Sequence, residues 1–245
     1  MRGDLTLPET FDPCLEGVDA VLLVWTAPPA TVPAVVDRIA RSARRIVFLS
    51  SPYKTDHPLF QAAQPNPISL LHADIERRLQ ASGRDWTFVR PGMFSANALW
   101  WWAPQIRSGA CVRWPYALVP TAPVHEADIA AVAVRALTSS ACAGAEYLVT
   151  GPQSLTHRDQ VGIIGDVLGR PLRYQEVDAD EWRRELPPDV PLGFSHVLLK
   201  VWGAALGHPA LVTSTVAEVT GTPARTFRDW VVENAAAFQL RTSAH

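Results

Sequence analysis

The feature that most constrains this chain is a continuous apolar run at residues 19–25, DAVLLVW, which has the length of a strand. A run without polar alternation is typical of a strand covered on both faces, as in a parallel sheet. Residues 31–43 follow with valine and isoleucine at helical spacing, and residues 45–49, RIVFL, form a second apolar run. Strand, helix and strand in this order predict a βαβ unit, so we expect an α/β fold.

The same alternation continues along the chain. A helical pattern at residues 69–81 ends before Gly83, and an apolar strand at residues 86–89 leads into Arg90-Pro91-Gly92. The later predicted elements are helices at 95–106, 127–137, 156–168, 179–186, 190–206 and 226–238 and strands at 146–149 and 172–177. We therefore predict a Rossmann-like domain over residues 1–150 and a smaller, mostly helical substrate lobe over residues 151–245 that packs on it.

Composition and charge exclude several classes of function. The chain has 22 basic and 24 acidic residues, a formal net charge of −2 and no long run of one sign, so we expect no nucleic-acid partner. Its three cysteines are widely separated and form no CxxC or Cys/His pattern, so we expect no metal site. No signal segment and no apolar stretch of about 20 residues is found, which favours a cytoplasmic protein over a membrane protein.

Glycine placement bears directly on nucleotide binding. A dinucleotide's diphosphate normally sits on the N-terminus of a helix that follows a glycine-rich turn, because free backbone N–H groups meet it there. Only Gly3 and Gly17 precede the first predicted strand. Gly162, Gly165 and Gly169 lie within or at the end of a helical pattern, where they favour close packing and helix termination over a phosphate loop.

Five segments, taken in order, resemble the NmrA-like branch of the atypical short-chain dehydrogenase/reductase superfamily. They are MRGDLT at 1–6, LEGVDAV at 15–21, VFLSS at 47–51, TFVRPGMF at 87–94 and VHEADIAAVA at 124–133. In that family the first segment follows the third strand, so the resemblance implies a Rossmann-like parallel sheet lacking its first βαβ portion, on the order of 50 residues. A start codon assigned too late and a genuinely shortened protein both explain this. The sheet edge left open would be covered by a dimer or a protein partner.

The resemblance also implies the cofactor, NADP or NAD, and the loops that contact it. These loops are Trp25, Thr26, Ala27 and Pro28 beside the adenine-ribose end, and Ser50, Ser51, Pro91, Gly92, Met93 and Phe94 at the nicotinamide end. All three loops follow predicted parallel strands, whose carboxyl ends are where open α/β sheets bind ligands. An ordinary role as turn residues is the alternative. Without a glycine-rich turn, we expect dinucleotide binding by this chain to be weak or absent.

Residues for proton transfer are less clearly marked. The Tyr-x-x-x-Lys pair of the larger superfamily is missing, and Tyr53 and Lys54 are adjacent instead. His72 and Glu76 are four residues apart and share a helix face, which suggests a histidine oriented by a carboxylate, or else a surface hydrogen-bonded pair. His72 and Tyr53 are therefore the candidate catalytic residues. The triplet at residues 100–102, WWW, fits either an aromatic ligand or packing of the lobe.

Three functions remain open on these observations. The first is a truncated NAD(P)H-dependent oxidoreductase that acts on a quinone or a small carbonyl compound once the absent segment is restored. The second is a non-catalytic regulator that senses redox state or binds another protein. The third is a cofactor-free isomerase or cyclase of an aromatic metabolite, with His72 or Tyr53 moving the proton.

Overall fold

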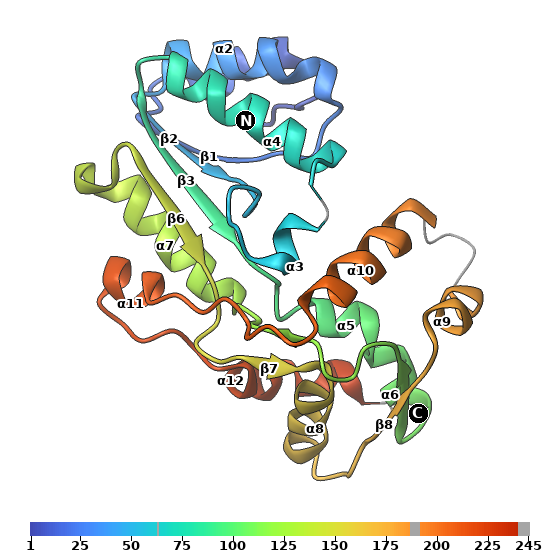
Figure 1. The fold of residues 1–245 in the computed structure, drawn as a ribbon. Coiled ribbons are helices and arrows are strands. Elements are labelled where there is room, and N and C mark those ends of the chain that lie inside the picture. Colours follow the sequence, from blue (N-terminus) through green and yellow to red (C-terminus); the bar gives the residue numbers. More distant parts are fainter. Residues whose placement is uncertain (63, 187–191, 240–245) are drawn as a thin grey trace, which may run out of the picture.

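The computed structural model describes residues 1–62, 64–186 and 192–239 (Figure 1). Its centre is a four-stranded parallel sheet with the order β1-β2-β3-β6. The strands are β1 (Ala20–Val24), β2 (Arg45–Leu49), β3 (Asp85–Pro91) and β6 (Ala145–Val149). The predicted α/β fold with a parallel sheet is confirmed.

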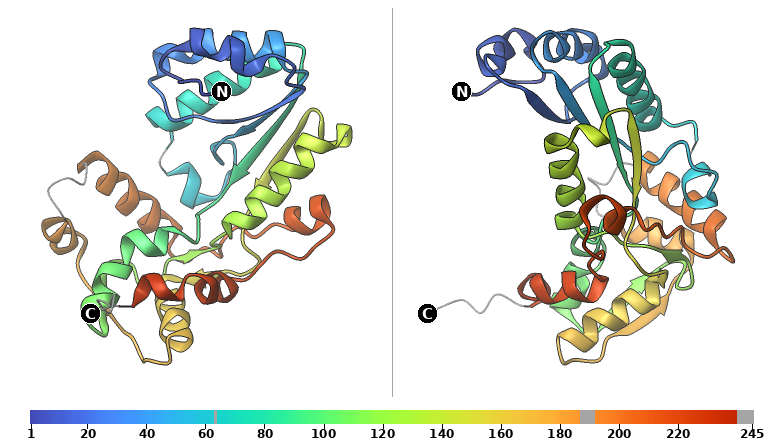
Figure 2. Two further views of the ribbon diagram at one scale, coloured as in Figure 1. Left: turned by 180° about the vertical axis from the view of Figure 1, so that it is seen from behind. Right: turned by 90° about the vertical axis from the view of Figure 1, so that its left-hand side faces the viewer.

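Helices cover both faces of this sheet (Figure 2). On one face α2 (Val32–Ser42) and α4 (Pro67–Ala81) bury Val36 and Leu79 against Phe48 of β2. On the other face α7 (Glu126–Thr138) packs Val132 against Val47. Successive residues of β2 thus enter two separate hydrophobic cores, which explains why this segment is apolar throughout.

Strand β1 lies at one edge of the sheet and pairs, within the part of the chain that the structure describes, with β2 alone. Leu23 is buried, whereas Leu22 and Val24 are 45% and 44% exposed. Coverage of both faces, which the apolar run predicted, is therefore wrong for β1. The α2 side is covered, and the side chains of Leu22 and Val24 on the opposite side meet too little of α7 to be buried.

A mostly helical lobe lies beyond the carboxyl ends of the strands (Figure 1). Segments from both sides of residue 150 build it, since β4 (Cys111–Trp114) pairs in parallel with β8 (Arg173–Glu176). The predicted helix at 95–106 is two helices, α5 (Asn97–Trp101) and α6 (Ala103–Ser108), because Pro104 begins a new helix. The start of the helix predicted at residue 190 lies outside the described residues, and α10 is described from Leu192 to Ala205.

The remaining elements are short or flank these layers. They are α1 (Asp12–Leu15), α3 (Pro58–Gln61), β5 (Pro120–Thr121), β7 (Leu155–Thr156), α8 (His157–Val167), α9 (Ala179–Glu185), α11 (Thr215–Thr220), α12 (Phe227–Glu233) and the 3-10 turns Pro8–Phe11, Pro29–Thr31, Ser140–Cys142 and Ala235–Phe238. Of the helices that the structure describes, none is long and apolar enough to cross a bilayer.

Tryptophans fill the centre of the lobe. Trp102 and Trp202 are fully buried, Trp114 and Trp182 are nearly so, and the imidazole of His157 packs among them. Trp100, the first residue of the triplet, is 84% exposed on α5. Two of the three tryptophans therefore build the lobe core, because Trp101 also packs against Trp114 and Trp202.

Candidate functional site

Three loops meet at the carboxyl edge of the sheet because all of its strands run in the same direction. Ser50 follows β2 and donates its backbone N–H to the carbonyl of Val89 at 2.8 Å. Gly92 follows β3 and donates to the carbonyl of Val149 at 2.8 Å. Each loop is thus fixed to the neighbouring strand, and the residues expected at the nicotinamide end lie side by side on β2 and β3.

The turn after β1 lies at the same edge. The indole N–H of Trp25 donates to the carbonyl of Ala27 at 2.6 Å and closes the turn. Pro28, Pro29 and Pro33 then lead into α2, and none of them has an N–H to offer an anion. No glycine-rich turn of the kind that usually receives a diphosphate follows any of the four strands of the described sheet.

The loop after β3 reaches across to the start of α7. Val124 donates its N–H to the Met93 carbonyl at 2.8 Å, and Ser95 donates to the Val124 carbonyl at 2.9 Å. This pairing holds Met93 and Phe94 between the sheet and the lobe. The Phe60 ring of α3 approaches the same loop, since a β-carbon at Gly92 would lie 3.7 Å from it.

Two serine hydroxyls at this edge are buried without a hydrogen-bond partner in the described part of the chain. They belong to Ser51, after β2, and Ser95, after Phe94. Buried hydroxyls are nearly always hydrogen-bonded, since an unmet one costs free energy. The described residues therefore leave both hydroxyls free to bind a polar ligand group, such as a cofactor's carboxamide or ribose, at the carboxyl edge of the sheet.

An ionic cluster with a buried centre, Glu76 and Arg90, lies beside these loops, and we call its six residues the Glu76 cluster. Its members are Ser50, Tyr53, Lys54, Glu76, Arg90 and Glu146. The Glu76 carboxylate is 1% exposed and accepts hydrogen bonds from Ser50 Oγ at 2.6 Å, Tyr53 OH at 2.6 Å, Arg90 Nε at 2.9 Å and Arg90 Nη2 at 2.6 Å. Every acceptor position of this buried carboxylate is occupied.

Charges and pKa values in the cluster follow from burial and from these bonds. Arg90 also donates from Nη1 to Glu146 at 2.5 Å, and Lys54 Nζ lies 3.0 Å from Glu146. Burial acts to raise the pKa of Glu146, but the hydrogen bonds from Arg90 and Lys54 outweigh it and lower the pKa. Burial, together with the hydrogen bond to Glu76, raises the pKa of Tyr53, so its phenol keeps its proton.

His72 lies on the same face of α4 as Glu76, but the carboxylate bonds to other partners. The imidazole packs edge-on against Phe48, with ring centroids 5.4 Å apart, and its Nδ1 atom has no hydrogen-bond partner among the described residues. Burial lowers the pKa of His72 despite the nearby Glu76 charge. The ring is therefore neutral at pH 7.

Sequence reasoning missed the Glu76–Arg90 pair and the Ser95 hydroxyl. One signal for the pair was available, since Arg90 ends an apolar strand that is buried on both faces, and a buried guanidinium requires a carboxylate partner. The spacing of His72 and Glu76 pointed to a different partner for the same carboxylate. Nothing in the sequence marks Ser95 apart from its place after the Met93-Phe94 loop.

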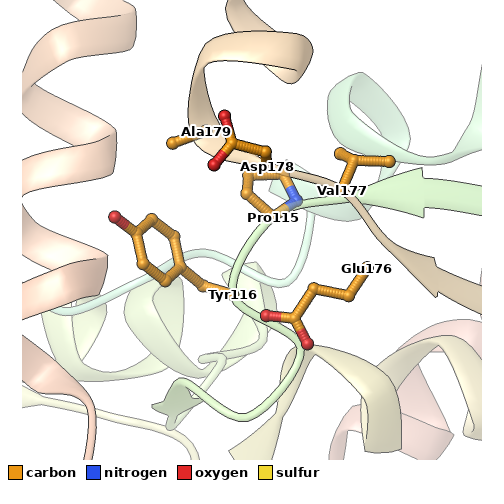
Figure 3. Close-up of a pocket in the computed structure, with 6 residues that line it drawn as sticks. All are labelled: Pro115, Tyr116, Glu176, Val177, Asp178 and Ala179. Atoms are coloured by element: carbon orange, nitrogen blue, oxygen red, sulfur yellow. The ribbon is translucent and has the colours of Figure 1, made fainter.

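The lobe has a separate cavity of about 340 Å³ at the carboxyl ends of β4 and β8. Figure 3 shows the Tyr116 ring and the carboxylates of Glu176 and Asp178 at its border. Tyr116 has a φ of 54°, which is uncommon for a residue other than glycine. None of the residues expected to bind a cofactor lines this cavity.

Comparison with known proteins identifies relatives along most of the chain. A family model described as NAD(P)H-binding matches residues 1–140. The chain is 40% identical over 237 residues to (4-alkanoyl-5-oxo-2,5-dihydrofuran-3-yl)methyl phosphate reductase of Streptomyces griseus, an alignment that covers 93% of this chain and 80% of the relative. It is 31% identical over 246 residues to the NAD(P)H azoreductase of Xenophilus azovorans, covering 96% of this chain and 82% of that protein.

Solved structures show the same fold. The NADPH-dependent quinone oxidoreductase of Escherichia coli, in complex with NADPH, superposes with a TM-score of 0.77 at 21% identity, over 95% of this chain and 82% of that one. The negative transcriptional regulator NmrA superposes with a TM-score of 0.70 at 17% identity, over 95% and 79%.

Proposed function

Because this chain belongs to the NAD(P)H-binding family, we propose that it uses NADPH or NADH to reduce a small molecule, either a quinone or a small carbonyl compound. The observation that carries the proposal is the match to the NAD(P)H-binding family of residues 1–140, whose loops after β2 and β3 meet at the carboxyl edge of the parallel sheet. The relatives whose names are reductases, one of them at 40% identity, support the same class of reaction.

In this reaction the reduced nicotinamide supplies a hydride. Ser51 and Ser95 orient the nicotinamide end through their hydroxyls, and Gly92, Met93 and Phe94 form its apolar wall. His72 is the candidate for proton transfer, because its ring is neutral at pH 7 and its Nδ1 atom has no hydrogen-bond partner in the part of the chain that the structure describes.

Affinity for the dinucleotide is a separate part of the proposal. The adenine-ribose end would lie on the turn of Trp25, Thr26, Ala27 and Pro28, whereas the described loops lack the glycine-rich turn that usually receives the diphosphate. We therefore expect weak binding by this chain alone, with no saturation at micromolar NADPH. Tight binding by the isolated chain would contradict this part.

The alternatives gain no comparable support. The regulator NmrA shares the fold at 17% identity, which carries no information about regulation. A cofactor-free isomerase or cyclase would use the same loops without a nucleotide, so NADPH binding distinguishes it from a reductase.

We further propose that the protein works in the cytoplasm and that another protein chain covers one edge of its sheet. Cys14, Cys111 and Cys142 are unpaired, as expected in the reducing cytoplasm. The open edge of β1, with Leu22 and Val24 exposed beside it, would be covered by a second copy of the chain or by another protein.

The test is NADPH and NADH oxidation with a panel of quinones and small carbonyl compounds, together with a fluorescence titration of each nucleotide. The variant His72→Gln is compared with His208→Gln, whose side chain is exposed. We expect nucleotide-dependent reduction that His72→Gln lowers by roughly 100-fold or more and His208→Gln leaves unchanged. Full activity in His72→Gln would remove that residue from the mechanism, and no oxidation with any acceptor would overturn the proposed reaction.

A further inference from the structure

One segment joins the sheet edge to the lobe. Residues 50–57 run from the end of β2 to α3, and α3 packs against α10 of the lobe (Figure 1). At the far end of the segment, His57 Nε2 lies 2.8 Å from the Pro209 carbonyl oxygen. Residues 50–57 therefore connect the end of β2 to α3, and the Phe60 ring of α3 would lie 3.7 Å from a β-carbon at Gly92.

Tyr53 attaches the middle of this segment to the interior. Its hydroxyl donates to Glu76 Oε2 at 2.6 Å, and its ring packs against the Arg90 guanidinium, 5.4 Å from the ring centroid. Lys54 is a second attachment, since its Nζ atom lies 3.0 Å from Glu146 Oε1. The backbone bonds nearby are local turns, from Tyr53 N to Ser51 O at 2.9 Å and from Thr55 N to Pro52 O at 3.4 Å. Such turns shape the segment but do not attach it to the core.

The Glu76 carboxylate, which accepts the hydrogen bond from Tyr53, is itself held in one orientation by other residues. Two bonds from Arg90 orient the Glu76 carboxylate, and Ser50 occupies the same oxygen as Arg90 Nε. A hydrogen bond to a buried, oriented carboxylate is shorter and stronger than one between neutral groups. Because the Tyr53 proton is held by this carboxylate, the phenol has no free donor to offer a substrate.

We propose that Tyr53 is a positioning residue for the reaction: its hydroxyl, held by Glu76, fixes residues 50–57 and thereby sets α3 against α10, which controls affinity for the electron acceptor. The assignment rests on the proposed reductase function. In this role Tyr53 is not the acid of the reaction. Its phenol takes no part in the hydride or proton transfer and only positions residues 50–57.

The experiment compares Tyr53→Phe with Tyr147→Phe, which removes a hydroxyl from β6 outside the Glu76 cluster. Hydrogen–deuterium exchange gives a readout that does not depend on activity. We expect the amides of residues 51–62 that the structure describes to exchange roughly fivefold to tenfold faster in Tyr53→Phe, the equivalent of one lost hydrogen bond, and to be unchanged in Tyr147→Phe. Unchanged exchange in both variants would overturn the proposal.

Steady-state kinetics separates positioning from catalysis. We expect KM for the acceptor to rise about tenfold in Tyr53→Phe, with kcat and the Kd for NADPH within about twofold of the parent. A fall in kcat of about 100-fold or more at unchanged KM would assign Tyr53 to proton transfer and overturn the positioning role. If the parent chain reduces no acceptor, the reductase function fails, and the exchange data still decide whether Tyr53 holds the segment.

Discussion

A β-carbon placed on Gly151 would lie 2.0 Å from the carbonyl oxygen of Pro123. The chain leaving β6 therefore crosses directly over the backbone that enters α7, and Gly151 N donates to the Ala122 carbonyl at 3.2 Å across this crossing. The glycine that follows β6 serves a close backbone approach. It is not part of a phosphate-binding turn.

Gly151→Ala is expected to destabilise the fold, because the obstructing atoms belong to the backbone and cannot rotate away. We expect the free energy of unfolding to fall by roughly 2–3 kcal/mol in urea titrations. Gly162→Ala is the matched control, since a β-carbon there meets nothing within 4 Å and Gly162 lies inside α8. The control is expected to be neutral or to gain up to about 1 kcal/mol. Equal stability of the two variants would contradict the claim that the backbone at Pro123 leaves no space for a β-carbon at residue 151.

His157 makes the fold sensitive to acid. Burial among the tryptophans lowers the pKa of His157 to about 3, although the carbonyls of Pro115 and Tyr116 act to raise it. The His157 imidazole therefore has its ordinary pKa near 6.5 in the unfolded chain and a much lower pKa in the folded chain, so that between these values only the unfolded chain binds the proton. Stability contributed by this residue is fully present above pH 6.5 and is lost as the pH falls from 6.5 toward 3, by at most about 1.4 kcal/mol per pH unit.

The measurement is the free energy of unfolding as a function of pH for the parent and for His157→Phe. The slope between pH 6 and 4 is expected to be smaller in the variant, because phenylalanine has no proton to gain. Packing differences shift the variant's whole curve, so the slope is the decisive quantity. Identical slopes in the two proteins would show that His157 does not contribute to acid sensitivity.

Periodicity was sufficient to predict the central layers but not the lobe. Residues 45–49 were predicted as a strand and form β2, because a segment buried on both faces leaves an unmistakable apolar run. The helix predicted at 95–106 failed at Pro104, because the apolar pattern continues through the tryptophans while the proline starts a second helix. The spacing of apolar residues predicts which residues are buried better than it predicts where one helix ends and another begins.

The candidate site shows the same division. Parallel strands alone predict that the loops after β2 and β3 meet at one edge of the sheet. The structure places residues 50–51 and 91–94 together there. The partner of Glu76 did not follow from spacing. His72 is four residues away on α4, yet Arg90 on β3 holds the carboxylate, because the position of α4 over the sheet decides which charge is buried beside it. Contacts between elements depend on that placement, which a local pattern does not contain.

Asp128 and Arg225 attach the segment before α12 to the first turn of α7. The Asp128 side chain is 2% exposed and accepts hydrogen bonds from the Arg225 backbone N–H at 2.7 Å and from its guanidinium. Asp128→Ala is expected to lower the free energy of unfolding by about 2–3 kcal/mol, since two bonds to a buried carboxylate are lost. Asp180→Ala, which breaks an exposed pair with Arg183, is the control and is expected to change stability by less than about 0.5 kcal/mol. A similar decrease in the free energy of unfolding in both variants would show that the buried Asp128–Arg225 contact stabilises the fold no more than an exposed ion pair does.

The exposed edge of β1 is expected to mediate self-association. Leu22 and Val24 present apolar side chains beside backbone groups of β1 that no other described strand pairs with, a combination that soluble proteins usually cover or charge. The double variant Leu22→Lys with Val24→Lys places two positive charges there, and we expect sedimentation velocity over a concentration series to show a shift toward monomer. Val134→Lys is the control, because Val134 is 57% exposed on α7 and is no part of the edge strand. If the parent remains monomeric at every concentration, or if Val134→Lys dissociates it equally well, the edge of β1 is not the surface through which copies of this chain meet.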